Sequence, residues 1–136
     1  MTKFYVLLLI VFMTCSIVIA GENEPNDKAN SSGLEKRCGM LSNPTPANWW
    51  LIDKDGTWII GAQGGYQVSD ESYDHLPQFP QNGKYWKNTN GSHGYGCVCL
   101  MVKVDRKKER VLEIQNGQTL PLAKCLADKN LNFKSR

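Results

Sequence analysis

The chain has 136 residues, of which 16 are Lys or Arg and 13 are Asp or Glu, and its formal net charge at pH 7 is +3. Because the cations are scattered along the chain and nearly balanced by acids, the composition argues against nucleic acid as the partner. The length suits one small domain.

Residues 1–20 (MTKFYVLLLIVFMTCSIVIA) are predicted to be an export signal peptide. Lys3 precedes a long apolar run, and the small residues Val18 and Ala20 precede the predicted cleavage site. A retained membrane anchor would need flanking cations, which the following GENEPNDKAN lacks. A lipoprotein would need Cys15 as its acylated residue, and the residues before Cys15 fit poorly. We therefore predict a periplasmic or secreted protein with no stable membrane anchor after cleavage.

Residues 21–36 contain almost no apolar side chain and are predicted to be a flexible leader. A single small β-rich domain is expected over 37–130, and residues 131–136 are expected to form a frayed tail. Within the domain, WWLIDKDGTWII places two apolar runs around an Asp-Gly pair, which predicts a β-hairpin. Asp53 and Asp55 could suggest a calcium loop, but the further acids of such a loop are missing, so turn chemistry is favoured.

Further along, residues 69–94 are predicted to be a long irregular loop with several aromatic residues. A strand is expected next, because Val98, Leu100 and Val102 alternate with Cys97 and Cys99. A charged turn over 105–108 and a returning strand follow. TLPLAKCLADKN is then expected to form a short helix that carries the last cysteine against the sheet.

Removal of a signal peptide would leave four cysteines, Cys38, Cys97, Cys99 and Cys125, which predict two disulfides in an exported domain. Cys97 and Cys99 lie two apart on one strand, close to the outer limit for bridging each other. We therefore expect Cys38 and Cys125 each to pair with one of them, and the sequence leaves open which. A zinc site with His93 matches the usual ligand spacing poorly, and no CxxC pair supports a redox role.

Several aromatic and amide side chains are not accounted for by the predicted disulfides or turns. Flat rings with oriented amides suit a sugar or a protein partner. The candidate ligand-binding residues are Trp50, Tyr66, Trp86, His93, Gln63 and Asn90. A hydrolase with catalytic residues in the 69–94 loop is the alternative. His75, His93, Glu71 and Asp74 are its available groups, but no known catalytic motif includes them, so no catalytic, metal or cofactor residue is predicted.

The words NPTPANWWL, DKDGTW, QGGY and NGSHGYGCVC occur in this order, preceded by RCG. Together they resemble a family of small exported bacterial proteins known as domain of unknown function 4087, over residues 37–125. The resemblance implies bacterial export and one compact domain, and it implies no activity.

The sequence thus predicts a mainly β fold, or α+β with one short C-terminal helix, in which a small antiparallel sheet is held by two disulfides. As a function it favours a non-enzymatic binding module or inhibitor at the cell envelope, with a glycan or protein as partner.

Overall fold

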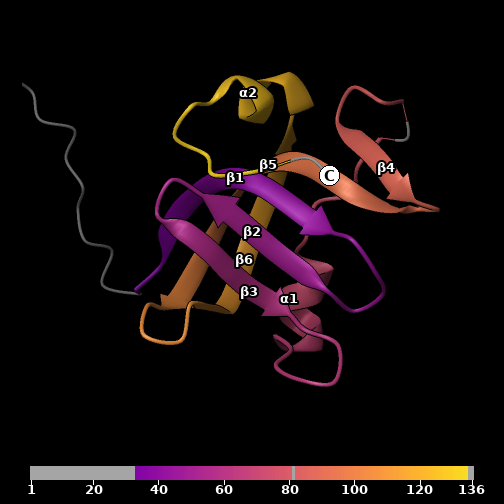
Figure 1. Cartoon of the computed structure of the whole chain (residues 1–136). Coiled ribbons are helices and arrows are strands. Elements are labelled where there is room, and N and C mark those ends of the chain that lie inside the picture. Colours follow the sequence, from indigo (N-terminus) through magenta and orange to yellow (C-terminus); the bar gives the residue numbers. More distant parts are fainter. Residues whose placement is uncertain (1–32, 81, 135–136) are drawn as a thin grey trace, which may run out of the picture.

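The computed structural model describes residues 33–80 and 82–134 (Figure 1). The predicted signal peptide and positions 21–32 of the predicted leader lie outside the described residues. The elements follow in the order β1 (Glu35–Asn43), β2 (Trp49–Asp53), β3 (Gly56–Gly61), α1 (Asp70–Asp74), β4 (Trp86–Asn90), β5 (His93–Asp105), β6 (Arg110–Leu120) and α2 (Leu122–Ala127). Neither of these short helices is long and apolar enough to cross a membrane.

Five of the six strands close into a barrel. The sheet order is β1-β2-β3-β6-β5-β4, and an additional pairing between β1 and β5 closes the ring and leaves β4 outside it. Every pairing is antiparallel except that of β3 with β6, which is parallel and consists of a single bridge. Without β4, this connectivity is that of the OB-fold, a five-stranded, partly open Greek-key barrel. The predicted mainly β fold with a C-terminal helix is confirmed.

Strand β1 is the shared wall of the barrel. It pairs with β2 through Met40, Leu41 and Ser42 and with β5 along its whole length. It begins at Glu35, so the predicted leader is two residues too long. A Cβ atom at Gly39 would lie 2.1 Å from the carbonyl oxygen of Ile52, and glycine is therefore needed at this crossing.

The alternation predicted for β5 is confirmed. Val98, Leu100 and Val102 lie inside the barrel with residues of β1, β2, β3 and β6. Cys97 and Cys99 lie on the outer side of the strand. There, α2 covers the outer face of β1 and β5, and Leu122 packs against Met40. The barrel therefore has an apolar interior and a second, smaller cluster beneath α2.

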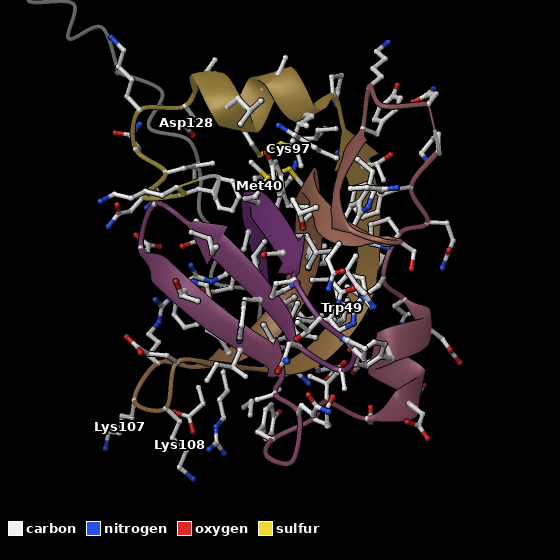
Figure 2. All side chains as sticks on the ribbon, turned by 45° about the vertical axis from the view of Figure 1, so that its right-hand side comes forward. Met40, Trp49, Cys97, Lys107, Lys108 and Asp128 are labelled. Atoms are coloured by element: carbon white, nitrogen blue, oxygen red, sulfur yellow. A yellow bond between two sulfur atoms is a disulfide. The ribbon has the colours of Figure 1, made fainter. Side chains whose placement is uncertain are left out.

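Both predicted disulfides are present. Cys38 bonds to Cys99, which lies directly opposite on β5, and Cys97 bonds to Cys125 on α2 (Figure 2). Each end of the domain is thus tied to the same strand, as expected. Residues 131–133 differ from the predicted frayed tail, because the ring of Phe133 packs on Tyr95 with 4.8 Å between ring centroids.

The hairpin predicted around Asp53 and Gly56 is also present. Asp53 Oδ1 accepts hydrogen bonds from the backbone N–H groups of Asp55 and Gly56, which is turn chemistry rather than calcium ligation.

Residues 69–94 contain more regular structure than the predicted irregular loop. Ser69 caps the N-terminus of α1 by accepting a hydrogen bond from the N–H of Ser72. Strand β4 then pairs with β5 in a hairpin whose turn is formed by Gly91 and Ser92.

Candidate binding face

A transverse row of side chains crosses the outer surface of β2, β3 and β6. Trp50 is the register partner of Ile59, and Ile59 is the partner of Arg110. The chain neighbours of these residues, such as Leu51 and Val111, lie inside the barrel, so the row itself points outward. Figure 1 shows β2 and β3 at the front with no helix or strand over them. We call Trp50, Ile59 and Arg110 the outer row.

Tyr66 extends the outer row from the loop that follows β3. Its hydroxyl donates a hydrogen bond of 2.7 Å to the carbonyl oxygen of Val111. The guanidinium of Arg110 lies over its ring, 4.6 Å from the centroid. This pairing orients both side chains at the β6 end of the row.

The turn between β5 and β6 borders the outer row with positive charge. Asp105 Oδ1 accepts hydrogen bonds from the backbone N–H groups of Lys107 and Lys108. Glu109 has a φ of 51°, and its carbonyl oxygen accepts a 2.8 Å hydrogen bond from the N–H of Ile59. Both lysine side chains are exposed and project away from the barrel (Figure 2). The two lysines therefore lie on a turn whose backbone is ordered by Asp105 and is hydrogen-bonded to β3.

An amide network joins the loops at the other side of β2. Asn43 is buried, and its Nδ2 donates to the carbonyl oxygens of Thr45 and Asn48 at 3.0 and 2.7 Å. Asn48 Oδ1 in turn accepts from the N–H of Gln63 at 2.8 Å. His93 Nδ1 lies 2.6 Å from Asn43 Oδ1, which can only accept, so Nδ1 carries the proton and donates. The network fixes these loops before any ligand arrives.

The predicted ligand-binding residues fall into three places. Trp50 lies in the outer row, Tyr66 packs partly against the barrel core beside Arg110, and the side chain of Gln63 is exposed in the adjoining loop. His93 belongs to the amide network. Asn90 is exposed where β4 ends, and Trp86 is only 6% exposed because it packs on Phe79, with ring centroids 4.7 Å apart.

Sequence reasoning missed Ile59 and Arg110. The run RKKER indicated only a charged turn, because the single bridge that brings β6 beside β3 leaves no local pattern. The shared register of Trp50, Ile59 and Arg110 depends on barrel closure, which one sequence does not reveal.

The groups of the alternative hydrolase are not assembled. His75 Nδ1 makes a 2.8 Å hydrogen bond with the carbonyl oxygen of Ile114, and His93 is bound to Asn43, so neither ring is paired with a carboxylate. Glu71 is exposed on α1. Within residues 33–80 and 82–134, no group of three His, Cys, Asp or Glu side chains could hold a metal ion.

A groove of about 990 Å³ lies elsewhere, between the start of β1, the β2–β3 turn and the segment after α2. Arg37 lies along it, 5% exposed, and is bound to Glu35, Asp53 and Asp55. The guanidinium also lies over the ring of Trp58, 3.9 Å from the centroid. Its Nε and Nη1 are thus engaged by carboxylates of the same chain, which indicates a structural charge cluster.

Burial raises the pKa of Tyr66, although nearby Arg110 acts in the opposite direction, and burial alone raises the pKa of Tyr73. A raised pKa keeps the phenol neutral in the folded state while the unfolded chain ionises near about pH 10. Stability from these rings is therefore complete below that pH and is lost as the pH rises towards the folded pKa. We predict that absorbance at 295 nm will show late-titrating tyrosines and that Tyr66→Phe will remove one. A curve identical to that of the unfolded chain would contradict this.

The comparison with protein families gives one match. The family described as protein of unknown function (DUF4087) matches residues 32–132. The chain belongs to this family. Comparisons with curated proteins and with solved structures gave no match. The family match agrees with the resemblance seen in the sequence, and for this DUF4087 chain the chemistry of the site rests on the residues described above.

Proposed function

We propose that the protein is a non-enzymatic binding module that holds a glycan of the cell envelope on the outer face of β2 and β3. The observation that carries the proposal is the half-buried Trp50 of the outer row, on the face of β2 and β3 that no helix or strand crosses in Figure 1, with the ring of Tyr66 beside Arg110 at its edge. Such rings offer flat apolar area to a sugar, and the nearby exposed amide of Gln63 supplies a polar partner. The OB-fold supports the same face by analogy, since its second and third strands bind oligosaccharides or oligonucleotides.

A glycan fits this face better than a protein does. Stable protein interfaces bury about 800 Å² on each partner around an apolar core. Among the described residues, Leu112 and Leu126 are the exposed large hydrophobic side chains, and Leu126 lies on α2, away from the outer row. The outer row instead alternates a ring, an aliphatic side chain and a cation, which suits a narrow polar ligand. The disulfides favour the oxidising environment of the envelope.

Replacing Trp50 with alanine should reduce retention on immobilised cell-wall polysaccharide by about tenfold, because one buried ring contact is worth on the order of 1 to 2 kcal/mol. The melting temperature should change little, since the ring is outside the barrel core. Affinity electrophoresis measures the first quantity and circular dichroism the second.

Tyr85→Ala is the matched control. Tyr85 is also a half-buried aromatic residue, but it directly precedes β4, the strand outside the barrel. Trp50→Leu keeps an apolar side chain at the position and separates the loss of the ring from a loss of folding. Equal retention of Trp50→Ala and the unmodified protein, or an equal loss for Tyr85→Ala, would contradict the proposal.

A further inference from the structure

Arg110 has an unusual environment for an arginine. The side chain is half-buried, and its Nε is buried without a hydrogen-bond partner. Among residues 33–80 and 82–134 no carboxylate pairs with its guanidinium, and its contact is the ring of Tyr66. Removing a cation from water is costly, and buried polar groups in native proteins nearly always have partners. The terminal nitrogens of the guanidinium, which make no ion pair with a described carboxylate, are therefore available to an outside acceptor.

The acids of the same turn do not supply this acceptor. Asp105 lies opposite Arg110 in the β5–β6 register, but its Oδ1 is engaged by the backbone N–H groups of the turn. Glu109 is exposed and makes no ion pair with a described cation. Residues 105–110 contain four cations and two acids, so the field around the guanidinium favours an added anion.

We propose that the ligand is an acidic polysaccharide, one anionic group of which binds Arg110 beside Tyr66 while an adjoining sugar packs on Trp50 and Ile59. This inference rests on the proposed function and adds the charge of the ligand. Two strand spacings separate the backbones of Trp50 and Arg110, about 10 Å, which a disaccharide unit can span. The planar guanidinium offers paired donors that match a carboxylate or a phosphate.

Single-stranded nucleic acid is the less favoured anion. Proteins that bind it combine a continuous positive groove with successive stacking rings. Here three cations without an ion pair to a described acid, Lys107, Lys108 and Arg110, lie at one end of the outer row, and Trp50 at the other end is adjoined by amides. The charge is thus localised, as expected for a ligand with anionic groups at intervals.

The test measures the affinity of the disulfide-bonded protein for four immobilised polymers by biolayer interferometry. Polygalacturonate presents carboxylates, phosphomannan presents phosphates, dextran is uncharged, and an oligothymidylate represents nucleic acid. We expect binding to one or both acidic polysaccharides, weaker at higher salt, and at least tenfold weaker binding to dextran. The stronger of the two acidic polymers identifies the anionic group.

Arg110→Gln should weaken binding to the acidic polysaccharide by about tenfold or more, because a hydrogen bond to a charged group is lost. Arg110→Lys keeps the positive charge but lacks the paired N–H donors of the guanidinium, so the loss of affinity should be intermediate. The binding that remains in this variant shows that folding is retained. Lys124→Gln removes the same charge from α2, outside the outer row, and should leave affinity unchanged.

Two results would overturn the inference alone. Equal binding to dextran, lost in Trp50→Ala but not in Arg110→Gln, would leave a glycan-binding face without a charge requirement. An equal loss in Lys124→Gln would indicate non-specific attraction. Failure to bind any of the three polysaccharides, or tighter binding to oligothymidylate than to all of them, would overturn the proposed function as well.

Discussion

Replacing both Cys38 and Cys99 with alanine is expected to lower the free energy of unfolding by about 4 kcal/mol, because the bridge closes a loop with a sequence separation of 61 residues. Without the bridge, the unfolded chain gains conformational freedom that the folded barrel does not. The bond also joins β1 to β5 where the barrel closes, so its loss removes a covalent link at that closure. Urea unfolding under non-reducing conditions measures the change.

The Cys97–Cys125 bridge provides the matched comparison. Its sequence separation is 28 residues, and the same chain-entropy relation gives a loss of about 0.7 kcal/mol less when both cysteines are replaced. This bridge ties α2 to β5 and does not close the barrel. A larger loss for this pair than for Cys38 and Cys99 would show that the packing of α2, rather than barrel closure, dominates the stability.

Replacing Asp53 with alanine should destabilise the protein by about 3 kcal/mol, since removing one partner of a buried ion pair leaves a poorly compensated charge. Asp53 is 4% exposed and bonds to Arg37 through Oδ2. Its Oδ1 accepts from Trp58 Nε1 at 3.0 Å and from two N–H groups of the hairpin turn. Burial acts to lower the pKa of Arg37, and hydrogen bonds to Asp53 and Glu35 outweigh it, so that the pKa is raised.

Asp55→Ala is the control for this variant. Asp55 also contacts Arg37, at 3.1 Å, but its side chain is 41% exposed. Ion pairs of exposed side chains contribute little to stability, so this variant should remain close to the unmodified protein in urea unfolding. Similar losses for both variants would mean that the turn, and not the buried pair, is the source of the stability.

The strongest sequence signals predicted the parts of the fold that they encode locally. Strand β5 follows from strict alternation, the β2–β3 hairpin from its Asp-Gly pair, and α2 from Pro121 at the start of a short helix. Strand β1 was missed because both of its faces are buried: Leu41 points into the barrel and Met40 lies under α2, so no alternation appears. Two weaker signals were available for the missed elements, namely Ser69 before α1 and the Asn-Gly pair between β4 and β5.

The candidate site was predicted less completely than the fold. Trp50 and Tyr66 were chosen by residue type, which also selected Trp86, although packing on Phe79 leaves Trp86 only 6% exposed. Arg110 was not chosen, because its missing partner is a property of the folded barrel and not of the sequence. Residue type therefore identifies candidates, and register determines which of them share a face.

The disulfides and the candidate binding face involve different strand pairings. One disulfide joins β1 to β5 and the other joins β5 to α2, so neither crosses the β3–β6 contact. That contact consists of one parallel bridge and the hydrogen bond from Ile59 to Glu109, and it lies directly beneath the outer row. A ligand that contacts both Trp50 and Arg110 would bridge β2 and β6 across this sparsely hydrogen-bonded pairing. Its binding would therefore stabilise the closed barrel reversibly, without a covalent bond.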